Sequence, residues 1–538
     1  MHYFGTMSLL RPLSDWKIML AATVLLVAAW NLPVLGLLII PAFVLLLELA
    51  FRPGRAFLKL YVVTALWNAA TTYWIANAHP LGLIATVFIN GALMAAALWL
   101  GARSSKMIRR FPKVERWSAL AYLPIFASWI AFEKLHDHWG LAFPWLNLGN
   151  TFNGTPIFVQ WYKWLGATGG TLWVLVVAMA VFEWQRGRWR KDRPLLLFLV
   201  PLLTSITLWS LPHSSKPSAW IKVAVVQPNI NAYTEKWELP EGEQIEKVRR
   251  LLQTHLGDQQ VDLIVLPETF LPKARQESTY GYSPMDRKLH QVLDTYGDAA
   301  IFGATTYDFQ DAPNAYNRPM GNRYYTLYNT ALFRPLGATN LLIGMPNADL
   351  YHKGKLVVGG ETMPFVQLLK PYLGDWAIEL GGTSGTLGIS NERTVFDNGK
   401  GLKLGPIICW ENEFSDYTTD YTKQGANLLA VITNDGWWGN TQGHVQHMRF
   451  SGLRAIENGR WVVRSANTGI SCVIDQKGGV HEPLGWEEEG VIVMEVPLLE
   501  GRTLYSRTGD WIGQFMVLLF ALNLGVLLFS RFFRLKPR

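Results

Sequence analysis

The chain has 538 residues, 50% of them hydrophobic, with 24 tryptophans, and is too long and too apolar for one soluble domain. Its formal net charge is +8. Most of the basic excess lies beside hydrophobic segments, so it indicates membrane orientation rather than nucleic-acid binding. The cysteines, Cys409 and Cys472, are too few for a disulfide scaffold and lack the spacing of a metal site. One disulfide between them stays open, and it would remove the Cys409 thiol from any chemistry.

Apolar residues crowd into residues 17–212 and 512–533, whereas 216–505 reads as a globular sequence. A helix crosses a bilayer with roughly 20 apolar residues. We predict eight such helices, at about 17–31, 33–51, 56–78, 80–102, 117–135, 168–184, 194–211 and 512–533. The first is interpreted as a retained helix, because no convincing cleavage site for a signal peptide precedes the second. The predicted domains are a seven-helix membrane domain at 1–215, an outer domain at 216–505, and the eighth helix with its tail at 506–538.

Positive charges alternate across the predicted loops. One side carries Arg11, Lys17, Arg52, Arg55, Lys59, Arg103, Lys106, Arg109, Arg110, Lys113, Arg116, Arg186, Arg188, Arg190, Lys191, Arg193, Arg531, Arg534, Lys536 and Arg538. The alternate short loops hold only Lys134 and Lys163. Because basic loops stay in the cytoplasm, both termini are predicted to be cytoplasmic. Residues 216–505 and the loop 136–167 are then predicted to lie on the outer side.

The outer loop is rich in aromatic residues, at Phe143–Gly149 and Trp161–Trp164. Such residues commonly anchor a protein at the headgroup region of the bilayer. An equally weighted interpretation is a loop that shapes an access route for a lipid. The pattern leaves both open.

The outer domain alternates short apolar strands with helical stretches, which is typical of an α/β sandwich. A helix is predicted near 240–256, with acidic residues first and basic residues later, as the helix dipole favours. The predicted strands are 221–227, 263–266, 300–304, 327–334, 404–409, 427–433, 461–466 and 470–474.

Three positions far apart in the chain carry residue types that complement one another. Glu268 ends one predicted strand, Cys409 ends another, and Lys353 lies in a polar stretch between them. Attack of a thiol on a carbonyl needs a base for the thiol proton and a positive group for the oxyanion. Glu, Lys and Cys meet those needs. Taken singly, each has an ordinary interpretation as a surface charge or a buried core cysteine.

The motifs around these residues resemble the nitrilase (carbon–nitrogen hydrolase) superfamily. They are Leu266-Pro-Glu268, Tyr351-x-Lys353, Cys409-Trp-Glu411, Asn434-Asp-Gly-Trp-Trp-Gly439, Arg454-Ala-x-Glu-Asn-Gly-Arg460 and Ala466-Asn-Thr-Gly469. The predicted layout of helices, with Pro144–Gly149 and the stretch from Gln227 to Lys236-Trp237, extends the resemblance over nearly the whole chain, to the membrane-embedded family of apolipoprotein N-acyltransferases. That resemblance implies a nitrilase-like αββα domain on the periplasmic side of a multi-pass protein of the bacterial inner (plasma) membrane.

The resemblance also implies roles. Cys409 is expected to take an acyl chain from a membrane phospholipid as a thioester and to pass it to the N-terminal amine of diacylglyceryl-cysteine apolipoproteins. Glu268 is expected to act as general base and acid, and Lys353 with the backbone amide after Cys409 to stabilise the oxyanion. Supporting positions are Glu361, Glu411, Trp410 and Trp237. No cofactor, no metal and no nucleic acid is expected.

The chain departs from the family pattern at the rim of the expected pocket. Val358-Gly359 replaces a Pro-Phe pair, Trp410 replaces a tyrosine, Leu266 replaces a tryptophan, and the segment from about 365 to 404 is longer than expected. These changes bear on the choice of acyl donor and acceptor. One alternative is a membrane-tethered amidase that uses water as acceptor. The other is a transporter or structural membrane protein. The presence of Glu268, Lys353 and Cys409 together disfavours it, and so does the lack of charge pairs within the predicted spans.

Overall fold

The computed structural model describes residues 13–109, 119–212, 216–335, 348–374 and 385–533, except for the side chains of 529–533. The chain divides into two compact units. The helical unit comprises the described parts of Met1–Ala76, Pro80–Leu211 and Thr508–Arg538, and the α/β unit comprises those of Asn77–His79 and Pro212–Arg507. Some predicted features lie outside the described residues: the start of the fifth span at 117–118, part of the segment 365–404, and the basic residues Arg11, Arg110, Lys113, Arg116, Arg534, Lys536 and Arg538.

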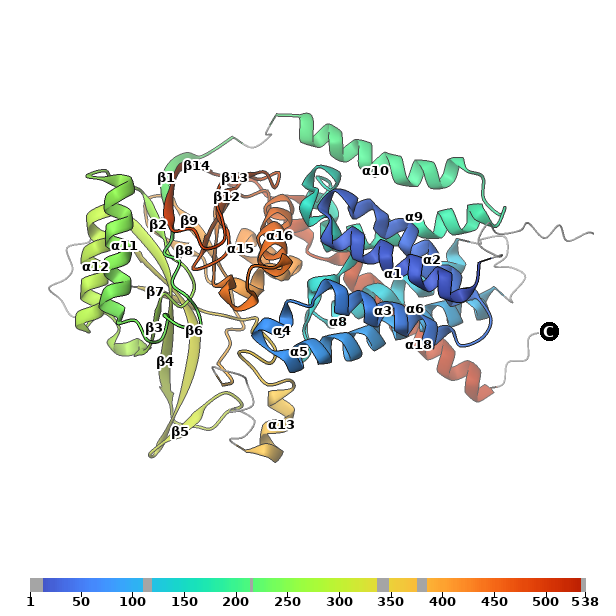
Figure 1. Ribbon diagram of the computed structural model, residues 1–538, viewed down its shortest axis with the longest axis horizontal. Helices are drawn as coiled ribbons and strands as arrows, with labels where there is room; N and C mark the ends of the chain where they lie inside the picture. Colours follow the sequence, from blue (N-terminus) through green and yellow to red (C-terminus); the bar gives the residue numbers. More distant parts are fainter. Residues whose placement is uncertain (1–12, 110–118, 213–215, 336–347, 375–384, 534–538) are drawn as a thin grey trace, which may run out of the picture. The chain divides into compact units, whose positions relative to one another are not determined.

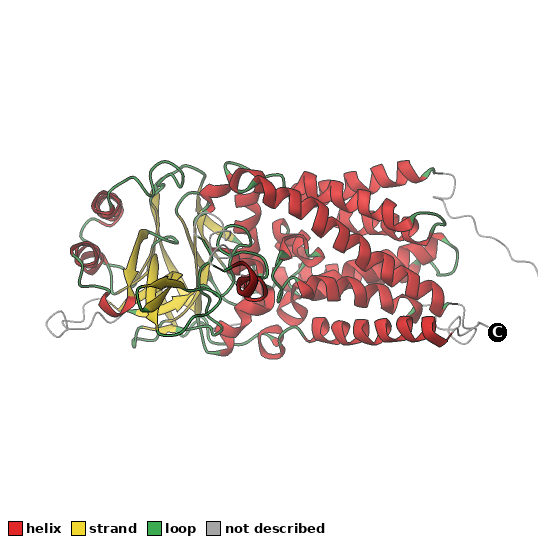
Figure 2. Ribbon diagram, turned by 90° about the horizontal axis from the view of Figure 1, so that it is seen from below, coloured by secondary structure: helices red, strands yellow, loops and turns green. Residues whose placement is uncertain are grey.

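Each of the predicted spans contains helix (Figures 1 and 2). The helices are α1 (Asp15–Asn31), α2 (Ile39–Phe51) after a 3₁₀ turn at Pro33–Leu38, α3 (Ala56–Thr71), α4 (Ile75–Ala78), α5 (Pro80–Ala85), α6 (Gly91–Ile108) after a π turn at Thr86–Asn90, α8 (Leu123–Leu135), α9 (Tyr162–Gln185), α10 (Asp192–Ser210) and α18 (Trp511–Phe533). Among the described residues, 5 helical stretches are long and apolar enough to cross a membrane: Pro33–Phe51, Pro80–Ile108, Tyr162–Gln185, Asp192–Ser210 and Trp511–Leu528. Helices α1, α3 and α8 have 17, 16 and 13 residues. The count of eight crossings therefore stays a prediction.

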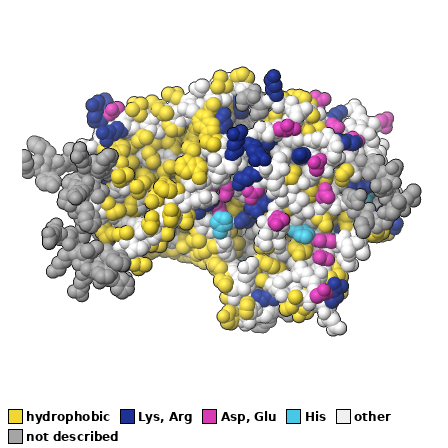
Figure 3. Space-filling view, turned by 180° about the vertical axis from the view of Figure 1, so that it is seen from behind, with side chains coloured by type: hydrophobic (Ala, Val, Ile, Leu, Met, Phe, Trp, Pro, Cys, Tyr) yellow, Lys and Arg dark blue, Asp and Glu magenta, His cyan; other side chains and the backbone are white. Residues whose placement is uncertain are grey.

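The helical unit exposes apolar side chains that a soluble surface would not carry. Leu196 on α10 is 59% exposed, and Leu522 on α18 is also 59% exposed. Figure 3 shows hydrophobic side chains over most of the visible face of this unit, whereas charged side chains are frequent on the α/β unit. Contiguous apolar surface of this kind marks contact with lipid or protein. It fits helices whose outer faces lie in a bilayer.

Charges inside the helical unit lie near the ends of helices. Glu48, in the last turn of α2, pairs with Arg52 at 3.0 Å and with Arg186 at 2.9 Å. Glu183, near the end of α9, pairs with Arg109 at 3.3 Å and with Arg188 at 3.1 Å. Long arginine side chains can reach a buried carboxylate while they stay near the membrane surface. These pairs tie the predicted cytoplasmic ends of the helices together and do not mark a conduction path.

Two sheets form the centre of the α/β unit. The larger has 8 strands and runs β14-β1-β2-β4-β6-β5, with β3 beside β4 and β7 beside β6; the smaller has 6 strands and runs β13-β12-β11-β10-β9-β8. The bounds in the first are β1 Ala219–Gln227, β2 Leu263–Val265, β3 Leu271–Gln276, β4 Ala299–Gln310, β5 Arg318–Met320, β6 Arg323–Pro335, β7 Asp349–His352 and β14 Gly490–Leu498. Those in the second are β8 Phe396–Asp397, β9 Lys403–Ile408, β10 Leu428–Thr433, β11 Val462–Ala466, β12 Ser471–Ile474 and β13 Val480–Leu484.

Alternation along the strands separates the layers. Val223 and Val225 of β1 join a core with residues of the second sheet, whereas Ala224 and Val226 join a core with α11 (Glu241–Leu256) and α12 (Pro284–Tyr296). Successive side chains of a strand point to opposite faces, so one strand serves both cores. Helices α15 (Ser415–Lys423) and α16 (Gln442–Asn458) contact the second sheet. The nitrilase-like α/β fold expected from the resemblance is confirmed.

The eight predicted strands and the helix near 240–256 are all present, with shifted ends. The strand predicted at 404–409 ends at Cys409, whereas β9 ends at Ile408 and Cys409 begins a 3₁₀ turn. The pattern missed β14, which pairs antiparallel with β1 from Ala219↔Leu498 to Gln227↔Gly490. Its partner is distant in sequence, so only tertiary structure reveals it. Cys409 and Cys472 are both free thiols, and the disulfide that the sequence left open is absent.

Candidate active site

The turn that carries Cys409 is held by a buried carboxylate two residues later. Cys409 has φ 48°, a left-handed conformation that is uncommon for a residue with a side chain. Glu411 Oε2 accepts from the Ile408 amide at 2.7 Å, and Glu411 Oε1 accepts from the Gly354 amide at 2.7 Å. Two tyrosine hydroxyls also donate to Oε1, from Tyr351 at 2.5 Å and Tyr417 at 2.9 Å. Glu411 therefore joins the end of β9 to the segment that carries Lys353.

Glu268 and Lys353 meet beside this turn. Glu268 follows β2, Lys353 follows β7, and their side chains are nearly inaccessible to solvent. Lys353 Nζ donates to Glu268 Oε1 at 3.0 Å and to Glu361 Oε1 at 2.9 Å. The main chain of β4 approaches so closely that a Cβ at Gly303 would lie 2.2 Å from the Thr269 amide nitrogen. The structure thus brings the buried Glu268 and Lys353 together with the partly buried Glu361.

Further donors orient the carboxylates. Asn329 Nδ2 donates to Glu268 Oε1 at 2.7 Å and to Glu361 Oε1 at 2.9 Å. The amide of Asn434 donates to Glu268 Oε2 at 3.1 Å. Sequence reasoning did not single out Asn329, although it is an asparagine within the strand predicted at 327–334.

The electrostatics define the resting protonation states. Burial opposes the charge of Glu268, but Lys353 and Lys236, with the hydrogen bond from Asn329, bring its pKa below the usual range. Burial also opposes the charge of Lys353, but the carboxylates of Glu268 and Glu361 raise its pKa well above normal. Burial, reinforced by the negative charge of Glu268, raises the pKa of the Cys409 thiol. The site therefore holds a carboxylate, an ammonium and a protonated thiol, and the thiol needs a base before it can attack.

A second lysine, Lys236, lies in the site. The stretch that contains Lys236-Trp237 was part of the resemblance, but the resemblance implied a role only for Trp237. Lys236 is buried, and its Nζ donates to the Thr269 hydroxyl. Burial lowers the pKa of Lys236 to about 8, although the charges of Glu268 and Cys409 oppose that change. Its neighbour Trp237, predicted as a site residue, is 55% exposed, whereas Trp410 is buried beside Cys409. Of the two predicted tryptophans, only Trp410 is part of the packed site.

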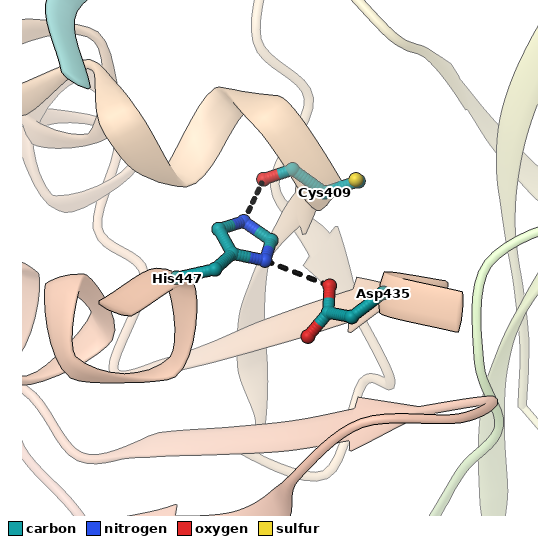
Figure 4. Close-up of side chains that lie close together, drawn as sticks. All are labelled: Cys409, Asp435 and His447. Carbon is teal, nitrogen blue, oxygen red and sulfur yellow. Dashed lines mark hydrogen bonds and ion pairs between the residues drawn. The ribbon is translucent and has the colours of Figure 1, made fainter. Parts of the chain in front are cut away.

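His447 and Asp435 lie close to Cys409 (Figure 4). Ligand atoms of Cys409, Asp435 and His447 all lie within 4.8 Å of one another, a grouping that could bind a metal by residue type. Both ring nitrogens of His447 are already engaged, Nδ1 with Asp435 Oδ1 at 2.8 Å and Nε2 with the Cys409 carbonyl at 3.1 Å. The arrangement therefore fits a hydrogen-bonded support rather than a metal centre.

Comparison with known proteins agrees with this site. The family model described as carbon-nitrogen hydrolase matches residues 222–504, and the model of the apolipoprotein N-acyltransferase N-terminal domain matches residues 22–180. The chain belongs to the carbon–nitrogen hydrolase family.

The curated relatives are more specific and cover both units. An apolipoprotein N-acyltransferase of Chlorobaculum tepidum is 26% identical over 86% of this chain and 84% of its own length. That of Geobacter metallireducens is 28% identical over 93% of this chain and 92% of its own. That of Pseudomonas syringae is 27% identical over 82% and 80%. The resemblance to apolipoprotein N-acyltransferases that the motifs indicated is confirmed.

Proposed function

We propose that this protein is an acyltransferase that moves a fatty acyl chain from a membrane phospholipid to the N-terminal amine of diacylglyceryl-cysteine lipoproteins. The observation that carries the proposal is the Glu268–Lys353–Glu361 cluster at the turn of Cys409, in a chain that also has helical stretches long and apolar enough to cross a membrane. The substrate class comes from the named relatives, which match both units. The phospholipid donor is our inference, because a membrane-embedded enzyme meets that acyl ester at highest concentration.

The chemistry proceeds in two half-reactions. In the first, Glu268 takes the thiol proton as Sγ of Cys409 bonds to the ester carbonyl carbon. Lys353 and the backbone amide of Trp410 stabilise the resulting oxyanion. The ester C–O bond then breaks, and Glu268 returns the proton to the departing lyso-phospholipid oxygen. The products are the lyso-lipid and a thioester on Cys409.

In the second half-reaction the thiol of Cys409 is the leaving group and an amine is the nucleophile. The free α-amine of the lipoprotein attacks the thioester carbon and loses a proton to Glu268. The C–S bond breaks, the amide forms, and the proton restores the Cys409 thiol. Glu361 keeps Lys353 charged and correctly placed through both steps, since its carboxylate pairs with the same ammonium at 2.9 Å.

We further propose that the protein spans the inner membrane of a bacterium with both termini in the cytoplasm and the α/β unit in the periplasm. The alternation of basic loops supports this orientation. It gives the active site access to lipoproteins that have already been exported. The division into segments 1–215, 216–505 and 506–538 belongs to the same proposal.

The decisive experiment follows the acyl group on the protein. Purified protein mixed with phospholipid and no acceptor should gain one fatty-acyl mass that hydroxylamine removes. Cys409→Ala should not gain it, and Cys472→Ala, the matched control, should. A lipopeptide with a free α-amine should discharge the acyl-enzyme, and an N-blocked one should not. Equally fast decay in water alone would replace the transferase with a hydrolase of the amidase type.

A further inference from the structure

A buried hydrogen-bond network that does not include Glu268 supports the main chain of Cys409. His447, on α16, and Asp435, after β10, are fully buried. Asp435 also accepts from Arg464 Nη2 at 2.6 Å and from the Thr433 hydroxyl at 2.8 Å. The network ends at the Cys409 carbonyl, which lies 3.1 Å from His447 Nε2.

The hydrogen position at this contact is determined. A carbonyl oxygen can only accept, so His447 Nε2 carries a hydrogen and donates it. In Figure 4 the thiol of Cys409 points away from the imidazole, while the carbonyl oxygen points toward it. His447 is therefore not the base that takes the thiol proton, as the histidine of a Cys–His pair would be.

The contact acts instead on the Cys409–Trp410 peptide. The described residues contain no cis peptide bond, and in a planar trans peptide the C=O and N–H bonds point in opposite directions. Holding the carbonyl against His447 therefore aims the N–H of Trp410 away from the imidazole, toward the side on which the thiol lies. That amide is the backbone donor that the mechanism assigns to the oxyanion. A hydrogen bond at the carbonyl also polarises the peptide and strengthens its N–H as a donor.

The backbone conformation gives this contact a second consequence. Cys409 has φ 48°, a strained conformation that persists only where the surroundings enforce it. Glu411 holds the turn through the Ile408 amide, before Cys409, and His447 holds it through the carbonyl, after Cys409. Both sides of the strained residue are thus anchored by buried side chains.

We propose that His447 is a positioning residue for the nucleophile, which orients the Cys409–Trp410 peptide so that the Trp410 amide faces the oxyanion. Asp435 and Arg464 hold the imidazole in place for this role. The inference rests on the proposed function, because it assumes that an acyl oxyanion forms at Cys409.

Two substitutions distinguish the contact made by Nε2 of His447 from the contact made by Nδ1. In His447→Gln the side-chain amide reaches the place of Nε2 and can still donate to the carbonyl. In His447→Asn the amide reaches only the place of Nδ1, so the contact with Asp435 can persist while the carbonyl loses its donor. His444→Asn is the matched control, since His444 is buried on the same helix and packs its ring against Trp486 at 4.6 Å.

Two reactions of the full-length protein then give the readout. Acylation by phospholipid passes through an oxyanion, whereas alkylation by iodoacetamide does not. Loss of one oxyanion donor lowers rates by about 10² to 10³. We expect His447→Asn to slow acylation at least about tenfold, with partial recovery in His447→Gln and little change in His444→Asn. Alkylation should change by less than about threefold, because it depends on the thiolate and its accessibility.

Each result decides the question. Equal loss of acylation and alkylation in His447→Asn would mean that His447 only maintains the fold, and unchanged acylation would mean that the contact has no role; either overturns the inference. If His447→Asn does not fold, His447→Leu, which also places no donor at the position of Nε2, is measured instead, and a ratio of acylation to alkylation equal to that of His444→Asn counts against the inference. Failure of the wild type to form an acyl-enzyme would instead refute the proposed function and the inference with it.

Discussion

Glu411 and Glu413 are two buried carboxylates in the same turn. We expect replacement of Glu411 by glutamine to destabilise the protein and replacement of Glu413 by glutamine to have little effect. Glu411 accepts hydrogen bonds from two backbone amides and two tyrosine hydroxyls. Glu413 is equally buried, but neither of its carboxylate oxygens forms a hydrogen bond among the described residues, and its Oε1 lies 3.6 Å from His447 Nε2. Burial raises the pKa of Glu413 well above its usual range, although the charges of Arg454 and Arg464 oppose that change.

The substitution Glu411→Gln places an amide NH₂ where one carboxylate oxygen was. In either orientation of the amide, this NH₂ faces a backbone N–H, from Ile408 or from Gly354, and that donor loses its acceptor. A buried unsatisfied polar group costs about 1–3 kcal/mol. For a folding unit of this size, a loss of about 2 kcal/mol lowers the melting temperature by roughly 4–8 °C. Glu413→Gln removes no hydrogen bond among the described residues and should shift the melting temperature by less than about 2 °C.

Thermal unfolding of both variants in detergent, followed by tryptophan fluorescence, gives the comparison. Single-turnover acylation of Cys409 should fall with Glu411→Gln, because the turn that presents the thiol loses an anchor, and should be largely kept in Glu413→Gln. Equal melting temperatures for the two variants would refute the reasoning, since they would show that the hydrogen bonds to Glu411 do not hold the turn.

Four further expectations follow from the same structure. Glu268→Gln should lower acylation of Cys409 by about 10² to 10⁴, measured by intact mass, because the protonated thiol loses its base; near-normal acylation would exclude Glu268 from that role. Cys472→Ala should keep activity, since Cys472 is a buried free thiol on β12, and a loss of turnover without unfolding would contradict that. Lys236→Met should be more stable than wild type at pH 7 by up to about 3 kcal/mol. The folded pKa of Lys236 is about 8 against an ordinary 10.5, so the cost of its buried charge is present below pH 8 and disappears as pH rises toward 10.5; a stability difference that does not shrink over that range would count against the buried charge. Reporters fused to the C-terminus and inserted within 216–505 should behave as cytoplasmic and periplasmic, and the reverse result would overturn the proposed orientation.

The local pattern of hydrophobic residues was enough to predict most of the membrane helices and many of the strands. A strand that packs on both faces, such as β10, must be apolar throughout, and a membrane helix must be apolar over its whole length. Both leave continuous hydrophobic runs that can be read from the chain. The lengths were less well defined, because the ends of α1, α3 and α8 depend on turns and packing rather than on hydropathy alone.

The residues proposed for the reaction could be identified in part from the same hydrophobic pattern. Glu268 and Cys409 stand directly after apolar strands, and their residue types complement Lys353. That Lys353 binds both Glu268 and Glu361 could not be read from the chain, because 85 and 8 residues separate the partners. Only the pairing of β6 with β4 and β7 brings Asn329 to the same carboxylates.

The sequence by itself determined the division between membrane helices and a polar α/β domain, the order of the main strands, and the residue types of the reaction, since each depends on composition or on neighbours along the chain. Tertiary structure alone decided which polar groups are buried together. Asn329 and His447 look like ordinary polar residues in the sequence, and the resemblance that includes Lys236 assigns it no role. Their importance comes from the loss of solvent around them, which makes each hydrogen bond and charge depend on partners supplied by distant strands and helices.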